Sequence, residues 1–328
     1  MIGKTNAGGL VPSGTIQITQ NGTTNVKTYE FADVNVSGGD YNIEQVIDGD
    51  ECTLNITTSI NSQTLAEFKK MVERSSNSIT LPDGTTKIGA YAFYNWTDNI
   101  AGTGNGLTNI ILPNSLLSIE KYAFSGLGQL TNVSFGNSLT TIGDCAFQYT
   151  SINSTQLPNS ITTINASAFS GCVNLKITQL PTSLTTIGNG AFSNSGIQIN
   201  SLPSTIYSFS ASAFSGCTGI VGKFVWNTSY MIVQGSLFYG CTNLTEFEYQ
   251  NVNSSSNRGQ ISNSAFSNSG LTKISFPNAT FPVTLQNKNA FPNGVNWTGT
   301  IEVPSALLNT WKTATNWDAL VNATWVGI

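Results

Sequence analysis

The sequence has no histidine and few charged residues. Its 328 residues include 13 basic and 17 acidic side chains, so that 9% are charged, against about 25% in an average soluble protein. Without histidine, Ser-His-Asp triads, Cys-His pairs and histidine-ligated zinc are excluded. The basic residues are too few for the stripe that nucleic-acid binding needs. We therefore expect no cofactor, no metal site and no nucleic-acid partner.

Long apolar segments are also missing. Nothing approaches the run of about 18 apolar residues that a membrane-spanning helix needs. The opening MIGKTNAGGLVPSG lacks the apolar stretch of roughly 7 to 15 residues that is typical of a secretory signal. We therefore expect a protein that is made in the cytoplasm without a secretion signal and does not insert into a membrane.

Uncharged polar residues are abundant instead, with 37 Ser, 41 Thr and 37 Asn. Residues 122–222 carry only Asp144 and Lys176 as charged side chains, although apolar residues recur among them at regular intervals. This regularity argues against disorder. In a stack of equivalent turns, identical charges would lie about 5 Å apart in rows and repel one another, so neutral side chains are favoured there.

A phenylalanine, usually preceded by alanine, recurs along most of the chain. The central spacings are 23, 22, 23 and 22 residues, with a step of 31 before them and steps of 24, 28 and 25 after them. This period is typical of leucine-rich repeats. The recurring positions are Phe93, Phe124, Phe147, Phe169, Phe192, Phe214, Phe238, Phe266 and Phe291.

Two further apolar positions keep a fixed phase with the first six phenylalanines. Twelve residues before them lie Leu81, Leu112, Phe135, Leu157, Leu180 and Leu202, and five residues before them lie Ile88, Ile119, Ile142, Ile164, Ile187 and Phe209. A single unit cannot bury these side chains, so neighbouring units must stack. The pattern predicts a mainly β repeat solenoid of about nine units, with the phenylalanines as a core ladder.

The repeat resembles a known family. The runs SLTTIGDCAF (138–147) and LPTSLTTIGNGAF (180–192), with the links FSGCVNL (169–175) and FSGCTGI (214–220), are similar to the BspA-like bacterial leucine-rich repeat over residues 79 to about 303. The resemblance implies a curved solenoid with a sheet on one face. It also implies use in adhesion and binding by exposed proteins, and no catalytic residues.

The flanks of the repeats predict terminal elements. Residues 14–36 alternate apolar and polar residues around Asn21-Gly22, which predicts a β-hairpin. Residues 62–75 and 303–317 have helical spacing and predict capping helices, the second with Leu307, Leu308 and Trp311 on one side. The expected organisation is an attachment domain over 1–60, a capping helix and link over 61–78, repeats over 79–302 and a cap over 303–328.

These flanks resemble a second group of proteins. The segment PSGTIQITQNGTTNVKTYEFADVNV (12–36), followed by a helix ending in MVERS (71–75), looks like proteins of gut phages and prophages that are virion-associated or of unassigned role. This resemblance implies a chain made in the cytoplasm and displayed on a virion surface.

The five cysteines show no metal-binding spacing, because no CxxC occurs. Cys172, Cys217 and Cys241 each lie three residues after a repeat phenylalanine, where another unit has Leu127. This equivalence favours small buried apolar side chains. The odd count, with Cys52 and Cys145 left over, favours free thiols, although Cys217 and Cys241 lie in adjacent repeats and could form a disulfide.

The residues that flank the inward positions of the strands form a candidate partner-binding face. It combines a hydroxyl and amide row with a short aliphatic row, although a shift of one residue in register would turn the face inward. Its members are Ser134, Gln156, Ile177, Gln179, Ile199, Ser201, Val221 and Lys223. Further candidates for exposed aromatic contacts are Trp96, Trp226, Trp297 and Trp325.

No set of residues predicts catalysis. Glu246 and Glu248 are two residues apart on an expected strand, and their ordinary interpretation is an exposed acidic pair rather than a polysaccharide-cleaving pair.

We therefore expect a non-enzymatic binding protein, in first place a phage capsid-decorating or receptor-binding protein. Residues 1–60 would contact another virion protein, and the repeats a host surface protein or glycan. A bacterial cell-surface adhesin is the alternative, a polysaccharide-acting enzyme a remote one, and homo-oligomerisation stays open.

Overall fold

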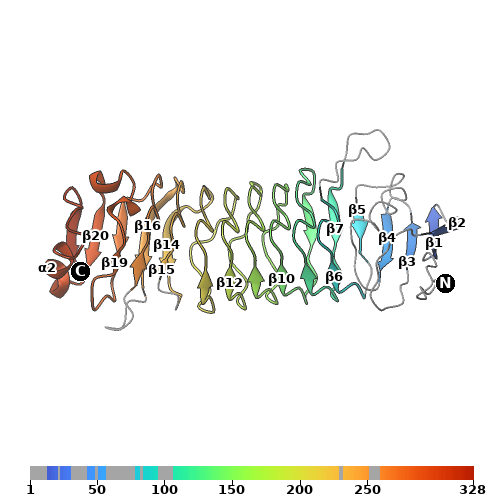
Figure 1. Cartoon of the computed structure of the whole chain (residues 1–328), viewed down its shortest axis with the longest axis horizontal. Coiled ribbons are helices and arrows are strands. Elements are labelled where there is room, and N and C mark those ends of the chain that lie inside the picture. Colours follow the sequence, from blue (N-terminus) through green and yellow to red (C-terminus); the bar gives the residue numbers. More distant parts are fainter. Residues whose placement is uncertain are drawn as a thin grey trace, which may run out of the picture. The chain divides into compact units, whose positions relative to one another are not determined.

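The computed structural model describes residues 13–20, 23–30, 43–48, 51–56, 78–81, 84–94, 106–228, 232–250 and 259–328. The chain forms two compact units, Met1–Asn153 and Ser154–Ile328. Each is built mainly of short strands that follow one another in chain order, as Figure 1 shows.

The first unit begins with an antiparallel pair, β1 (Ser13–Gln20) and β2 (Thr23–Glu30). These strands flank residues 21–22, so the predicted hairpin is confirmed. A sheet then runs through β3 (Ile43–Asp48), β4 (Glu51–Ile56), β5 (Ser78–Thr80), β7 (Asn109–Ile111) and β9 (Asn132–Ser134). Only β3 and β4 are antiparallel in it. A second row of parallel strands contains β6 (Lys87–Ile88), β8 (Ser118–Ile119) and β10 (Thr141–Ile142).

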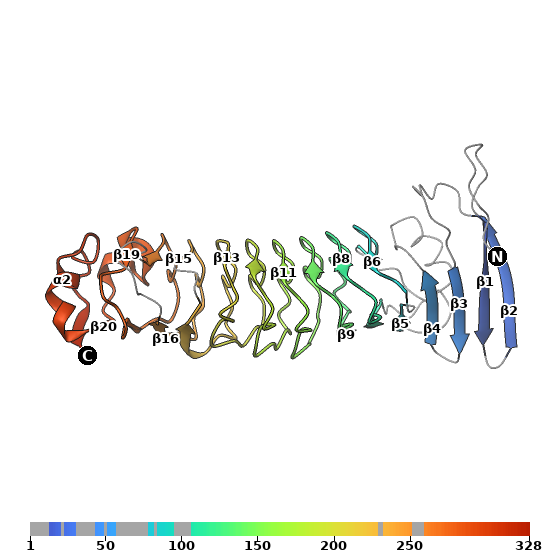
Figure 2. The same ribbon diagram turned by 90° about the horizontal axis from the view of Figure 1, so that it is seen from below.

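The second unit contains three rows of parallel strands. The first is β11 (Thr163–Ile164), β12 (Thr186–Ile187) and β13 (Ser208–Phe209). The second is β14 (Gly222–Trp226), β16 (Leu244–Tyr249), β18 (Lys273–Ser275), β20 (Thr300–Val303) and β21 (Thr324–Gly327). The third is β15 (Ile232–Val233), β17 (Gln260–Ile261) and β19 (Thr284–Leu285). Neighbours within a row come from successive repeats, so the predicted parallel β-solenoid is confirmed (Figures 1 and 2).

The repeat phenylalanines form the centre of both units, and all nine side chains are 0% exposed. In the first unit the ring centroids of Phe93, Phe124 and Phe147 lie 5.0 Å apart from one to the next. In the second unit the steps from Phe169 to Phe291 measure 5.5 to 6.1 Å. Because each ring stacks on its neighbours, the core is continuous within each unit.

The alanine that precedes most of these phenylalanines has a backbone role. In the first unit the Phe93 N–H donates to Ala123 O at 2.7 Å, and in the second the Phe192 N–H donates to Ala213 O at 2.8 Å. The alanine side chains are fully buried. In the one unit where leucine replaces this alanine, Leu237 is also fully buried and the Phe214 N–H still donates to Leu237 O, at 3.1 Å, so the bond is a property of the repeat backbone.

Neutral hydroxyl groups also join successive turns. Thr140 Oγ1 donates to Leu117 O at 3.0 Å, and Thr185 Oγ1 donates to Thr162 O at 3.0 Å. Thr131, Thr205 and Thr272 make the same kind of bond to the carbonyl of a preceding turn. The carbonyls of Leu117 and Thr162 already accept from the backbone N–H of Thr140 and Thr185, so the hydroxyls add a second bond between turns without any charged group.

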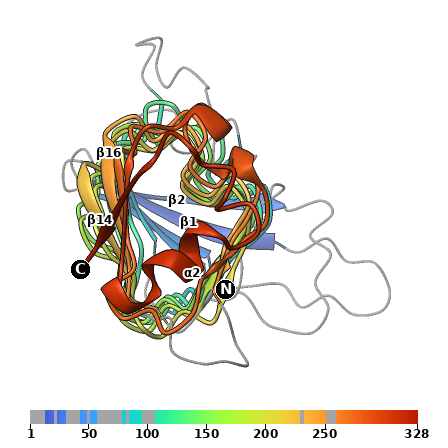
Figure 3. The same ribbon diagram turned by 90° about the vertical axis from the view of Figure 1, so that its left-hand side faces the viewer.

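Short helices occur only in the second unit among the described residues: η2 (Lys288–Ala290), η3 (Gly294–Asn296), η4 (Ser305–Leu307) and α2 (Leu308–Lys312). The predicted C-terminal helix is therefore much shorter than residues 303–317. Figure 3 shows α2 across the end of this unit's turns. Trp311 is buried, whereas Leu307 and Leu308 are half-buried. The predicted helix within 62–75 lies outside the described residues.

Candidate functional site

The polar members of the predicted face lie at the surface. Ser134 in the first unit and Gln156 and Gln179 in the second are exposed, and Ser201 is partly exposed. The Gln156 and Gln179 side chains make no hydrogen bond within the part of the chain that the structure describes. We name Gln156, Gln179 and Ser201 the amide row. Its two amides keep their full donor and acceptor capacity for water or a partner.

The prediction of an exposed aliphatic row is wrong at two of its three positions. Ile177 is 0% and Ile199 is 1% exposed, so both belong to the core, while Val221 is 66% exposed. Two residues, rather than one, separate Ile177 from the next buried position at Leu180, and the same spacing separates Ile199 from Leu202. This segment is not a regular strand, so strict alternation assigns its side chains to the wrong side.

Charged side chains continue the face over the last repeats of the second unit, where they alternate in sign. Lys223 on β14 pairs with Glu248 on β16. Lys273 Nζ on β18 lies 3.3 Å from Glu246 Oε2 and 3.4 Å from Glu302 Oε1 on β20. We name these five residues the ion-pair ladder. Lys223, a member of the predicted face, is therefore engaged within the chain.

The ion-pair ladder also contains Glu246 and Glu248, the acidic pair that the sequence offers as a remote candidate for polysaccharide cleavage. The hydrogen bond from Lys223 lowers the pKa of Glu248, against the opposing effect of burial, and Gln250 adds a second hydrogen bond at 2.7 Å. A general acid needs the opposite shift, a raised pKa. Glu246 and Glu248 therefore act as partners of lysines.

The cysteines are free thiols wherever the structure describes their side chains: Cys145, Cys172, Cys217 and Cys241. Cys217 and Cys241 are not bonded to each other. Cys217 Sγ donates to Phe192 O at 2.9 Å, and Cys241 Sγ donates to Phe214 O at 3.0 Å. Burial raises the pKa of Cys217 to about 12 and raises the pKa of Cys241 as well. Both thiols are inert parts of the core.

Two of the four tryptophan candidates are core residues. Trp226 is 0% and Trp297 is 3% exposed, which corrects the expectation of exposed aromatic contacts at these positions. Each packs against aromatic rings of the second unit, Trp226 against Phe247 and Trp297 against Phe291. Trp325 is half-buried, and Trp96 lies outside the described residues.

A tyrosine cluster in the first unit was not predicted. The Tyr91 and Tyr122 rings stack with centroids 5.0 Å apart, and Tyr94 meets both edge-on. Tyr91 and Tyr94 are 40% and 42% exposed, and a hydrogen bond with Cys145 raises the pKa of Tyr122. The sequence does contain a pattern that indicates this cluster. Tyr91 and Tyr122 lie two residues before a repeat phenylalanine and Tyr94 lies one residue after one, at positions where most later units have serine.

Metal and membrane features are absent within the described ranges. No three cysteine, aspartate or glutamate side chains there gather in a way that could hold a metal ion. No helix in that part of the chain is long and apolar enough to cross a membrane.

The fold and its surface define a class, the parallel β-solenoid repeat proteins, whose geometry is typical of binding and adhesion. The family model of the BspA type leucine rich repeat region matches residues 51–101, 101–221 and 221–310, most of the chain, in six copies. The chain therefore belongs to the BspA-type leucine-rich repeat family. No curated protein matches.

Solved structures of bacterial leucine-rich repeat proteins are similar to this chain. A leucine-rich repeat protein from Bacteroides ovatus is 17% identical, with 89% of this chain and 100% of that chain covered and a TM-score of 0.44. A leucine rich cell surface protein from Faecalibacterium prausnitzii is 16% identical, with 90% and 96% covered and a TM-score of 0.40. One from Eubacterium ventriosum is 17% identical, with 74% and 84% covered and a TM-score of 0.33.

Proposed function

We propose that the chain is a non-enzymatic binding protein whose repeats contact a protein or glycan on a bacterial cell through the amide row. The observation that carries the proposal is the exposure of Gln156 and Gln179 without a side-chain partner in the described residues. At the equivalent positions further on, charged side chains pair with each other. The amide row thus presents hydrogen-bonding groups that the fold itself does not use.

Cell binding by a labelled protein tests the proposal. The double variant Gln156→Ala, Gln179→Ala should bind a panel of bacterial cells at least tenfold more weakly than the natural chain, with an unchanged melting temperature. Gln129→Ala changes another exposed glutamine, in the first unit, and should bind normally. Equal loss in both variants, or loss in neither, would contradict the proposed role of the amide row.

We further propose display on a virion surface, with residues 1–60 contacting another virion protein. The support is the resemblance of residues 12–36 and 71–75 to phage and prophage proteins. Membership of the BspA-type family supports the second candidate, display on the bacterial cell surface. Peptide mass spectrometry of purified phage particles and of surface-shaved cells separates the two, because the chain should be found in only one of these samples.

A further inference from the structure

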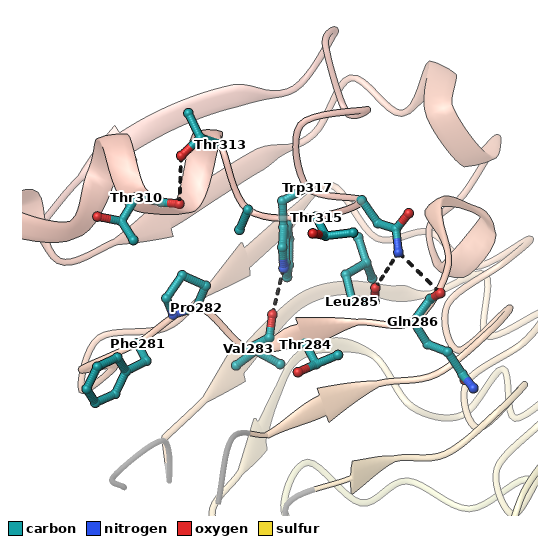
Figure 4. A pocket seen from close by; sticks show the side chains of 12 residues that line it. Phe281, Pro282, Val283, Thr284, Leu285, Gln286, Thr310, Thr313, Thr315 and Trp317 are labelled. Carbon is teal, nitrogen blue, oxygen red and sulfur yellow. Dashed lines mark hydrogen bonds between the residues drawn. The ribbon is translucent and has the colours of Figure 1, made fainter. Parts of the chain in front are cut away.

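A groove of about 680 Å³ lies between two segments of the second unit that are far apart in sequence. One wall is formed by residues 281–286, which include β19, and the other by residues 310–317, which follow and overlap the end of α2 (Figure 4). The volume falls within the range of about 300 to 1,000 Å³ that is typical of small-ligand sites. No residue of the amide row lines the groove.

Hydrogen bonds and ring packing fix the two walls to each other. Trp317 Nε1 donates to Val283 O at 2.7 Å, and Asn316 Nδ2 donates to Leu285 O at 2.7 Å and to Gln286 O at 3.3 Å. Trp317 is 1% exposed and packs edge-on against Trp311. The groove is therefore already formed without a ligand, which reduces the entropy lost on binding.

The lining has no ionisable side chain. It combines four threonines, one glutamine and one asparagine with an apolar floor and a phenylalanine, Phe281, that is 38% exposed. A charged ligand would lose hydration here without meeting a counter-charge. A neutral sugar ring carries hydroxyl groups at its edge and apolar C–H groups on its faces, and so matches both parts of this lining.

A peptide strand is a poorer fit, although β19 is the last strand of its row. A peptide that extends a sheet must bond to the free backbone groups of the edge strand. Asn316 already occupies the carbonyls of Leu285 and Gln286. The side chain thus blocks strand addition at the place where a peptide would dock.

From this geometry we propose that the groove binds a neutral oligosaccharide. The sugar ring stacks on Phe281, while its hydroxyl groups bond to the hydroxyls of Thr284, Thr310 and Thr315, to Gln286 Nε2 and to Asn316 Oδ1. The hydroxyl of Thr313 donates to Asn309 O, Gln286 Oε1 accepts from the Asn263 N–H, and Asn316 Nδ2 donates to Leu285 O, so these three groups are already engaged within the chain. The assignment is independent of the amide row and adds a second contact site to the chain.

The test uses the full chain and saturation-transfer NMR with titration calorimetry. The probes are neutral hexasaccharides of glucose, mannose and N-acetylglucosamine, together with an acidic oligogalacturonate and a neutral threonine- and valine-rich hexapeptide. We expect at least one neutral hexasaccharide to bind, and neither the acidic oligosaccharide nor the peptide to bind more tightly. Binding of no neutral hexasaccharide, or a preference for the acidic probe or the peptide, would overturn the proposal.

Variants locate the site. Phe281→Ser should weaken binding about tenfold, the loss expected for one aromatic contact, and Thr284→Trp should abolish it by filling the groove. Tyr207→Ser is the matched control, because Tyr207 is an exposed aromatic residue outside the lining, and it should bind normally. The double variant of the amide row should also bind normally. Unchanged binding in Phe281→Ser and Thr284→Trp, or loss of binding in the amide-row variant, would place the sugar elsewhere and overturn the assignment.

Discussion

At the scale of the residue, the shortage of charge has a structural reason beyond the avoidance of like-charge rows. Threonine hydroxyls reach back one turn and donate to backbone carbonyls at about 3 Å, for example from Thr185 to Thr162 and from Thr205 to Thr182. Lysine and glutamate cannot make this short bond with the same geometry, and glutamate has no donor. The hydroxyl-rich composition therefore serves the contacts between turns as well as solubility.

The buried thiols predict a specific dependence of stability on pH. In the folded chain the pKa of Cys217 is raised from 9.0 to about 12 by burial, so the folded state keeps a proton that the unfolded chain releases. The stability that this thiol supports is complete below pH 9 and is lost as the pH rises toward 12. The slope approaches about 1.4 kcal/mol per pH unit for one such group.

Urea unfolding of the natural chain and of Cys217→Ala, measured from pH 8 upward, checks this dependence. Above pH 9 the free energy of unfolding should fall less steeply with pH in the variant, whereas below pH 9 the two chains should show the same pH dependence. Parallel slopes above that pH would show that the thiol ionises equally in both states.

At the scale of the element, successive turns approach so closely that a side chain is excluded at some positions. A Cβ at Gly188 would overlap the backbone of Asn165 and Ala166 in the preceding turn. Backbone atoms cannot move aside without separating the two turns. Gly188→Ala should therefore lower the free energy of unfolding by roughly 1 to 3 kcal/mol, measured by chemical denaturation. Gly128→Ala, where nothing lies within 4 Å of the new Cβ, should change it little, and equal effects would contradict the steric reason.

The ion-pair ladder makes the β14–β20 sheet sensitive to acid and salt. Because the hydrogen bond from Lys223 lowers the pKa of Glu248 below 4.5, this pair stabilises the fold above that value and the contribution is lost as the pH falls. Lys223→Gln should reduce stability at pH 7 by no more than about 1 kcal/mol, since the pair is partly solvent-exposed. The difference should shrink at pH 3 and in 1 M salt. A difference that persists under both conditions would indicate lost packing instead.

The elements also show what the sequence can and cannot predict. The phenylalanine ladder and the positions five residues before it were predictable, because their spacing stays constant while the turns stack. The burial of Ile177 and Ile199 was not, because one additional residue before Leu180 and Leu202 breaks the alternation of a strand. The groove could not be predicted either, since its walls are about 30 residues apart and meet only through the packing of Trp317.

At the scale of the whole molecule, the C-terminal residues cover the last rings of the aromatic core. The ring centroids of Trp311 and Trp317 lie 4.5 and 5.7 Å from the ring centroid of Phe276. The Trp317 centroid also lies 5.7 Å from that of Phe291. Uncovered aromatic rings at the end of a solenoid promote association, which is why terminal repeats are usually capped.

A chain that ends at Val303 should therefore form soluble oligomers or aggregates and bind a hydrophobic dye, as measured by size-exclusion chromatography with light scattering. Val321→Ser, at a side chain that is 79% exposed, should remain in the same state as the natural chain. If the shortened chain stays in that state with an unchanged melting temperature, residues 304–328 are not the cap.

The alternation of positive and negative charge in the ion-pair ladder restricts where this protein can gain or lose a repeat. In the neutral segment between residues 122 and 222, one repeat can be gained or lost without bringing like charges together. Between β14 and β20, duplication of the turn that carries Glu246 and Glu248 would place four carboxylates on adjacent strands, and loss of that turn would bring Lys223 next to Lys273. Variation in repeat number among related chains should therefore concentrate in the neutral segment and spare the ladder.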